Sequence, residues 1–411
     1  MKWPLIAQLL LLLLVLAPGG RAQEKELPRE WTDPDTGHRV VRLSDEGGSQ
    51  SLYFHQNAYT PDGRTLVITT PTGLAAIDLK THALRKIVPE RVNLIMVGRK
   101  TGQAYYVRAG EIFAVDVNTK TVREIGTIPA GGSIASVNAD ETLLAGTVTK
   151  GTPPAAPRGG GDNYPGKGDM MERRLAAHIP MELFTLNVKS GETKTILRST
   201  DWINHVQFSP TDPGLLMFCH EGPWHKVDRT WTIRTDGTGL TQIHRRTMNM
   251  EIEGHEFFSP DGRTIWYDLQ TPRSEVFWLA GYEIATGTRT WYHLQPSEWS
   301  VHFNESPDGK LFAGDGGGPT SVAAPNNGQW IYLFHPELTS DRSDGQLPNA
   351  DELIHPGVLK AEKLVNLARH NYQLEPNVTF TPDGQWIVFR SNMFGPTHVF
   401  AVEIAAGPKK P

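Results

Sequence analysis

The chain has 411 residues, of which 38% are hydrophobic and 21% charged, so it can bury a large core and is neither collagen-like nor disordered. Its 40 basic and 45 acidic side chains give a formal net charge of −5, which offers no general attraction for nucleic acid. Helical patterns are scarce, whereas 40 Gly and 30 Pro residues favour many short strands joined by turns, and this argues against helical bundles and parallel α/β folds.

The first 22 residues have the pattern of a secretory signal peptide. Lys2 supplies a positive charge, an apolar run follows from Leu5 to Leu16, and Gly20-Arg21-Ala22 provides a small-residue cleavage site. A transmembrane anchor is the other interpretation, but this run is shorter than the roughly 20 residues that a spanning helix needs. We therefore expect cleavage after residue 22, no membrane anchor in the mature protein, and a periplasmic or secreted location.

A phrase of the type Ser/Thr-Pro-Asp-Gly recurs along the chain, followed each time by an apolar, strand-like run. Proline presets φ at the first corner of a turn, aspartate bonds its own backbone and glycine accepts positive φ, so each copy predicts a hairpin. The copies are Thr60-Pro61-Asp62-Gly63, Ser209-Pro210-Thr211-Asp212, Ser259-Pro260-Asp261-Gly262, Ser306-Pro307-Asp308-Gly309 and Thr381-Pro382-Asp383-Gly384, with Asn138-Ala139-Asp140-Glu141 as a degraded copy.

The spacing of these turns predicts seven repeats. Pro210, Pro260 and Pro307 are 50 and 47 residues apart, the length of one propeller blade. The longer intervals hold one further blade, with its turn at residues 98–102, and two polar insertions, over 150–169 and roughly 336–364. The last repeat is short of a strand, which we expect residues 38–43 to supply. The sequence thus predicts an all-β, seven-bladed β-propeller with four-stranded antiparallel blades, formed by residues 23–411 as one domain.

The repeat also predicts a site, because the innermost strands of a propeller line its central channel. The position five residues before each turn proline is occupied by Gln56, His205, His255, His302 and Asn377. Three consecutive blades thus offer a histidine at one height. Glu375, two residues before Asn377, is expected on the same face. Imidazole with amide and carboxylate oxygens suits a divalent cation such as Mn²⁺ or Zn²⁺.

Residues 219–231, between the fourth and fifth turns, are dense in polar and aromatic side chains. Cys219 has no partner cysteine in the sequence and is interpreted as a small core residue. The run Gly314-Asp315-Gly316-Gly317-Gly318 lacks the helix that a phosphate-binding loop requires, so we interpret it as a propeller loop.

Several long phrases resemble the oligogalacturonate lyase family, over residues from about Gln56 to Ile404. They are His220-Glu221-Gly222-Pro223-Trp224, Arg229-Thr230-Trp231-Thr232-Ile233, Glu251-Ile252-Glu253-Gly254-His255-Glu256-Phe257, Trp299-Ser300-Val301-His302-Phe303-Asn304 and Val388-Phe389-Arg390-Ser391-Asn392-Met393. The resemblance implies a seven-bladed propeller that cleaves short galacturonate oligomers by β-elimination with a divalent metal, usually Mn²⁺, in the channel.

The resemblance also implies roles for individual residues. The catalytic base falls on His255, the assisting arginine on Arg229 and one metal ligand on His302. The family's Gln-x-x-His-Pro-His phrase is replaced here by Tyr372-Gln373-Leu374-Glu375-Pro376-Asn377, so Glu and Asn stand where two histidines are common. A carboxylate and an amide oxygen suit Mn²⁺ or Ca²⁺. The expected metal set is His302, Glu375, Asn377, Gln373 and His205.

The implied reaction removes the proton at C5 of a uronate, which requires a base and a cation near the C6 carboxylate. The expected partner is therefore an acidic oligosaccharide, and the expected substrate-binding residues are Gln56, His220, His225, Lys226, Asn304, Tyr372 and Arg390. Two alternatives are a non-catalytic periplasmic propeller, since the repeats alone indicate only a fold, and a lyase for a different uronic acid.

Overall fold

The repeated Pro-Asp-Gly phrases form the turns that the sequence predicts. Gly63, Gly262, Gly309 and Gly384 have φ values of 68°, 73°, 70° and 68°, in the left-handed region that favours glycine. In the first of these turns the Asp62 carboxylate accepts a hydrogen bond of 2.6 Å from the Thr60 hydroxyl. Each turn therefore joins an inner strand to the second strand of a blade.

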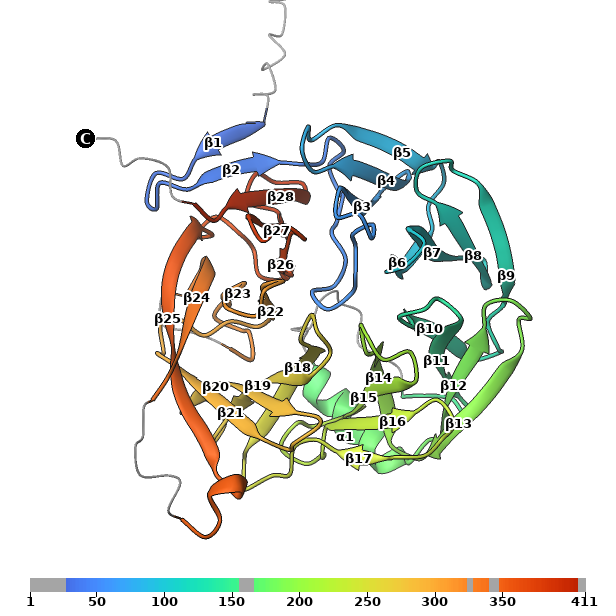
Figure 1. Cartoon of the computed structure of the whole chain (residues 1–411), viewed down its shortest axis with the longest axis vertical. Helices are drawn as coiled ribbons and strands as arrows, with labels where there is room; N and C mark the ends of the chain where they lie inside the picture. The colour runs from blue at the N-terminus through green and yellow to red at the C-terminus, as the bar shows by residue number, and fades with distance from the viewer. Residues whose placement is uncertain (1–26, 155–165, 324–327, 340–346, 406–411) are drawn as a thin grey trace, which may run out of the picture.

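The computed structural model describes residues 27–154, 166–323, 328–339 and 347–405, and these form seven blades around a central channel (Figure 1). The all-β propeller fold predicted from the sequence is confirmed. Blades 1 to 3 comprise β3 (Thr65–Thr70), β4 (Gly73–Asp78) and β5 (Leu84–Val88); β6 (Asn93–Val97), β7 (Gln103–Arg108), β8 (Glu111–Asp116) and β9 (Val122–Thr127); and β10 (Gly132–Val137), β11 (Leu143–Thr149), β12 (Met181–Asn187) and β13 (Thr193–Ser199).

Blades 4 to 6 have four strands each. They comprise β14 (Trp202–Phe208), β15 (Leu215–Glu221), β16 (Thr230–Arg234) and β17 (Thr241–Gln242); β18 (Ile252–Phe258), β19 (Thr264–Gln270), β20 (Phe277–Glu283) and β21 (Arg289–Leu294); and β22 (Phe303–Glu305), β23 (Phe312–Gly314), β24 (Trp330–Leu338) and β25 (Ile354–Asn366).

The ring closes as expected, with an N-terminal strand completing the last blade. Blade 7 contains β26 (Thr379–Phe380), β27 (Trp386–Ser391) and β28 (His398–Glu403), and β2 (Arg39–Arg42) pairs antiparallel with β28. β1 (Glu30–Thr32) adds a fifth strand at the outer edge. Joining the two ends of the chain in one sheet removes the free edge that an open blade would leave.

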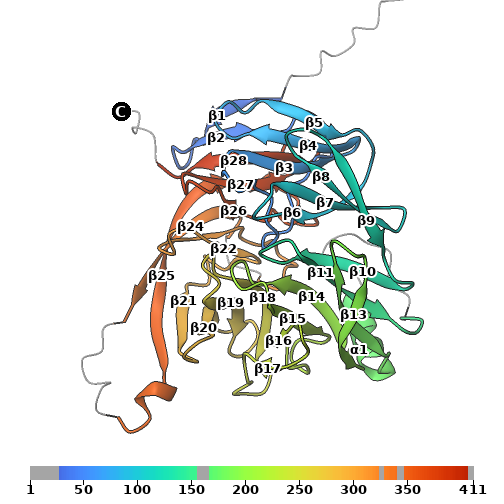
Figure 2. The ribbon, with the colours of Figure 1, turned by 45° about the vertical axis from the view of Figure 1, so that its right-hand side comes forward.

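Besides the five-stranded blade 7, three blades depart from the expected four-stranded antiparallel pattern. In blade 1 the innermost segment forms only isolated bridges, Gln50 with Thr69 and Tyr59 with Leu66, because the chain between them leaves the sheet and enters the channel. Blades 5 and 6 share an eight-stranded sheet in which β21 runs parallel to β25. The long hairpin of β24 and β25 projects beyond the ring (Figures 1 and 2) and includes a 3₁₀ helix, Ala350–Glu352.

The connection between β11 and β12, which begins with the first predicted insertion and extends beyond residue 169, contains a helix, α1 (Lys167–Ala177), that the sequence does not predict. The expected signal peptide, residues 1–22, lies outside the described residues, as do Gly159 to Gly161 of this insertion. The division of the chain into a leader and one mature domain therefore stays a prediction. Among the described residues, no helix is long and apolar enough to cross a membrane.

Candidate active site

Bulges in the inner strands carry two of the three channel histidines. The pairing of β14 with β15 shifts register between Asn204 and Gln207, and that of β18 with β19 shifts between Gly254 and Phe257. His205 and His255 occupy these bulges with φ of 48°, a left-handed conformation that is rare for residues other than glycine. Such strain occurs at functional sites, where the surrounding structure holds a side chain in one direction.

Two of these histidines are each oriented by an aspartate thirteen residues later, which lies in the second strand of blade 5 and directly after the second strand of blade 6. His255 Nδ1 donates to Asp268 at 2.8 Å, and His302 Nδ1 donates to Asp315 at 2.8 Å. All four side chains are almost fully buried. The two imidazole rings meet edge to face, with centroids 4.8 Å apart and an angle of 79° between their planes. A carboxylate on Nδ1 fixes the tautomer, so Nε2 is the nitrogen that can accept a proton or a metal.

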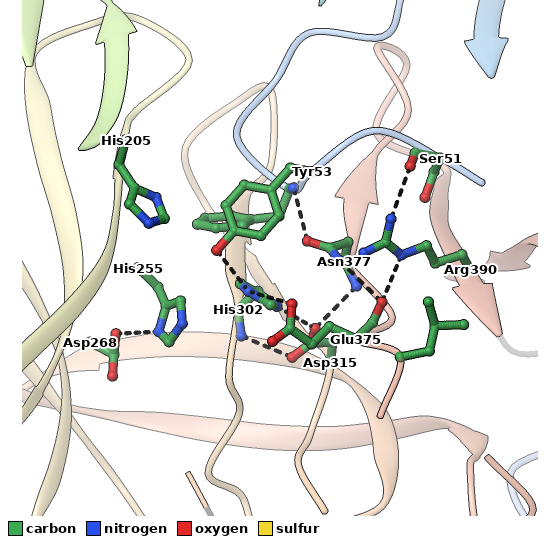
Figure 3. A network of polar contacts seen from close by, with 12 residues as sticks. Ser51, Tyr53, His205, His255, Asp268, His302, Asp315, Glu375, Asn377 and Arg390 are labelled. Carbon is green, nitrogen blue, oxygen red and sulfur yellow. Dashed lines mark hydrogen bonds and ion pairs between the residues drawn. The ribbon is translucent and has the colours of Figure 1, made fainter. Parts of the chain in front are cut away.

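The loop that replaces the inner strand of blade 1 brings Tyr53 to this pair (Figure 3). The Tyr53 hydroxyl donates to His302 Nε2 at 3.1 Å, and Glu375 Oε2 lies 3.7 Å from the same nitrogen. The neighbouring Phe54 is 1% exposed and packs on Phe257, so the loop is anchored in the channel. A pocket of about 330 Å³ opens beside these groups and is lined by Tyr53, His55, Gln56, Ala135, Asn204, His205, Val206 and Glu375.

Asn377 is near His302 but its side chain serves the backbone. Its amide oxygen accepts from Phe54 N at 3.2 Å, and its amide nitrogen donates to the Glu375 carbonyl at 3.1 Å. Its own backbone N–H donates to Asp315 at 3.1 Å. The amide therefore holds two segments together, and a ligand role for its oxygen stays a prediction.

Arg390 occupies the position in blade 7 that Asp268 and Asp315 occupy in blades 5 and 6, thirteen residues after the channel residue. Its guanidinium donates to the Glu375 carbonyl at 2.8 Å (Figure 3) and to Gln50 Oε1 at 2.9 Å. Burial lowers the pKa of Arg390 from its ordinary value. The side chain thus supports the backbone that carries Glu375.

Arg229 is buried, and its guanidinium is paired with protein carboxylates. It is 1% exposed and bridges two buried carboxylates, Glu221 at 3.0 Å and Glu256 at 3.1 Å. Burial alone would raise the pKa of Glu256, but Arg229 and His205 hold it at about 2. In this arrangement Arg229 positions Glu221, whose carboxylate accepts from the Trp224 indole at 2.9 Å. A direct contact of Arg229 with substrate stays a prediction.

His205 faces the same channel, with its ring 5.9 Å from that of Tyr53 and its Nε2 3.5 Å from Glu221. Ligand atoms of His205, Cys219 and Glu221 lie within 4.8 Å of one another. This group suits a cation poorly, because Glu221 is already paired with Arg229 and burial raises the pKa of the Cys219 thiol well above its ordinary value.

The residues around His302 fit a hard or borderline divalent cation better. An imidazole whose other nitrogen is held by a carboxylate is the usual arrangement of a metal-ligating histidine. Glu375, 7% exposed, adds a carboxylate oxygen beside Nε2, and the Tyr53 hydroxyl adds a neutral oxygen. This set of one nitrogen and two oxygens suits Mn²⁺.

The remaining predicted residues are dispersed. Gln373 is exposed, and its backbone N–H donates to the Asn371 side chain at 3.0 Å; its expected ligand role stays a prediction. Tyr372 and Asn304 use their polar groups on backbone atoms of Asp315, Phe54 and Phe380. Gln56 accepts from Tyr53 N and lines the pocket. His220, His225 and Lys226 lie outside it, with Lys226 paired to Glu172 of α1 at 2.7 Å.

Three residues of the site were not predicted from the sequence: Tyr53, Asp268 and Asp315. The aspartates had a signal, since each follows a channel histidine by thirteen residues in consecutive blades. Tyr53 had none, because its position depends on blade 1 lacking a regular inner strand.

Comparisons with known proteins agree with this architecture. The family model described as oligogalacturonate lyase matches residues 22–407. Oligogalacturonate lyase of Dickeya dadantii is 24% identical over 406 residues, covering 91% of this chain and 95% of that protein, and oligogalacturonide lyase of Pectobacterium atrosepticum is 24% identical over 395 residues with the same shares.

Solved structures share the fold. An oligogalacturonate lyase in complex with manganese superposes with a TM-score of 0.74 and 22% identity, over 92% of this chain and 96% of that one. An oligogalacturonate lyase from Vibrio parahaemolyticus gives a TM-score of 0.74 and 20% identity over the same shares. Because the family model spans nearly the whole chain, this protein belongs to the oligogalacturonate lyase family.

Proposed function

We propose that this protein cleaves galacturonate oligomers by β-elimination, with unsaturated uronates as products. The observation that carries the proposal is the pair of aspartate-oriented imidazoles, His255 and His302, held 4.8 Å apart at the channel pocket. Two adjacent and differently partnered imidazoles provide a base and a cation ligand in one place. Family membership supplies the substrate class.

His255 is the proposed base. Its Nδ1 hydrogen is committed to Asp268, so Nε2 takes the C5 proton of the uronate. The electron pair of the C5–H bond forms the C4–C5 double bond, the C4–O4 bond breaks, and the departing oxygen takes a proton from water. As the proton arrives, the buried Asp268 carboxylate stabilises the imidazolium that forms.

A cation is proposed to act beside the base. His302 and Glu375 would hold it, with the Tyr53 hydroxyl as a neighbouring oxygen, and Mn²⁺ is the cation that one structural relative contains. When bound, the cation neutralises the substrate carboxylate and so makes the adjacent C5 proton more acidic. Asp315 keeps His302 in the orientation that this requires.

We also propose that the protein is exported before it acts. The pattern of residues 1–22 supports this location, in the periplasm or outside the cell. N-terminal sequencing of the protein from a bacterial host tests it, and a mature form that still begins at Met1 would contradict it.

The proposed reaction is tested by following the absorbance of the unsaturated product with trigalacturonate as substrate. His255→Ala should lower turnover by about 10² to 10⁴-fold, the usual contribution of a general base. Asp261→Asn, a change in the exposed turn of the same blade, is the matched control and should keep full activity. If His255→Ala eliminates at the wild-type rate, the assignment of the base is wrong.

A further inference from the structure

A second pocket lies next to the candidate active site, beyond Trp224. We call it the α1 pocket. Its volume of about 410 Å³ is within the range of small-molecule sites. Its walls come from the connections between the second and third strands of four consecutive blades: the start of α1, residues 223–225, Arg273 and residues 320–322. Because the repeat places these connections at the same end of each blade, they form one continuous surface.

Trp224 separates this pocket from the base and is held rigidly. Its ring meets that of His255 edge-on, with centroids 5.7 Å apart, and its indole nitrogen is fixed by Glu221. The Arg229 guanidinium and Lys167 Nζ each lie 5.3 Å from its ring centroid. Trp224 is only partly buried, and the accessible part of this fixed indole offers an apolar surface on which the carbon face of a pyranose ring can pack.

The charges of the α1 pocket favour an anion. It is lined by two cations, Lys167 and Arg273, and by two carboxylates, Asp169 and Glu172, of which Glu172 is already paired with Lys226 at 2.7 Å. Arg273 is exposed, and its guanidinium makes no hydrogen bond or ion pair with any residue in the described part of the chain. The loop that carries it is fixed, since Arg273 N donates to the Met250 carbonyl at 2.9 Å. The pocket thus presents a guanidinium close to an aromatic wall.

We propose that the α1 pocket is a subsite for a third uronate residue, next to the pair that flanks the cleaved bond. The ring of this residue packs on Trp224 and its carboxylate is bound by the fork of Arg273. The inference rests on the proposed function, because it assigns a further residue of the same substrate. It makes the connection between β11 and β12, which contains α1, a determinant of chain-length preference.

The test compares kcat and KM for digalacturonate and trigalacturonate in Arg273→Gln and wild-type protein. A dimer spans only the cleaved bond and does not reach Arg273. Loss of one charge-assisted contact at an exposed site should therefore lower kcat/KM for the trimer by about tenfold, mainly through KM, and leave the dimer unchanged. Arg263→Gln, which removes an exposed arginine from the Pro-Asp-Gly turn of the same blade, is the matched control and should match wild type on both substrates.

Equal kcat/KM values in Arg273→Gln and wild type, or an equal loss on dimer and trimer, would overturn the subsite. A binding titration separates this result from failure of the proposed function. Trimer binding, followed by tryptophan fluorescence, is measured in His255→Gln with and without Arg273→Gln. Weaker trimer binding in the double variant supports the subsite even if the wild-type protein eliminates nothing, and unchanged binding overturns it.

Discussion

The hydrogen bond from His255 Nδ1 to Asp268 can be tested without removing the base itself. Asp268→Asn keeps the size of the side chain but replaces a charged acceptor by a neutral amide. If the amide oxygen faces Nδ1, the tautomer is kept and only the charge-assisted part of the bond is lost. That part is about 1 to 1.5 kcal/mol, or roughly tenfold in rate.

If the amide nitrogen of the substituted side chain faces Nδ1 instead, the hydrogen moves to Nε2, and His255 must change tautomer before it can accept the substrate proton. A buried hydrogen bond must then break, which costs a further ~1 to 3 kcal/mol. Because the pair is 2.8 Å long and nearly inaccessible to water, we expect a total loss in kcat of about 10² to 10³-fold.

The assay measures kcat and KM for trigalacturonate together with thermal unfolding of Asp268→Asn and of Asp261→Asn, the turn control. A positioning role predicts a lower kcat with KM nearly unchanged in a protein that remains folded at the assay temperature. Wild-type kcat in Asp268→Asn would refute the reasoning, because the buried carboxylate would then contribute nothing to proton transfer.

The remaining predictions concern the cation, the buried ion pairs and the channel loop. Chelation should suppress elimination, and Glu375→Gln should weaken Mn²⁺ binding at least about tenfold, as measured by the electron paramagnetic resonance of free Mn²⁺; full activity in a metal-free protein would contradict both. Burial opposes ionisation of Glu256, yet Arg229 and His205 keep its pKa at about 2 against an ordinary 4.5. The ionised carboxylate therefore contributes roughly 3 kcal/mol to the free energy of unfolding above pH 4.5, and this contribution is lost as the pH falls toward 2. An acid-unfolding midpoint that is unchanged in Glu256→Gln would be inconsistent with this. Tyr53→Phe should leave the fold intact but change Mn²⁺ affinity measurably in the same titration, and an identical affinity would exclude the Tyr53 hydroxyl from the cation site.

The sequence predicts the propeller because its turns are local. Each Pro-Asp-Gly phrase specifies a hairpin by the chemistry of adjacent residues, as in the hydrogen bond between Thr60 and Asp62, and the repeat then specifies the ring. The closing strand, β2, was predictable for the same reason, since a blade with a missing strand requires a partner. The parallel pairing of β21 with β25 was not, because it joins an insertion to a neighbouring blade.

The candidate site was predictable only in part, because some contacts depend on distant segments. The common position of His205, His255 and His302 follows from the repeat. The hydrogen bond from Phe54 N to the Asn377 amide does not follow from the repeat, because Phe54 is 323 residues away and reaches Asn377 only through the irregular loop of blade 1. Arg229 illustrates the same limit, because its pairing with Glu256 joins two blades.

The position thirteen residues after each channel residue explains how one repeat provides different chemistry in adjacent blades. In blades 5 and 6 this position holds an aspartate, which orients the imidazole of the channel histidine. In blade 7 this position holds Arg390, which donates to the backbone carbonyl of Glu375. The carboxylate of Glu375 is directed toward His302. One imidazole and one carboxylate form a harder donor set than several imidazoles, so the charge of this site depends on blade 7. A carboxylate ligand cancels one charge of a divalent cation, so a cation held by His302 and Glu375 would attract a uronate less strongly than one held by imidazoles alone.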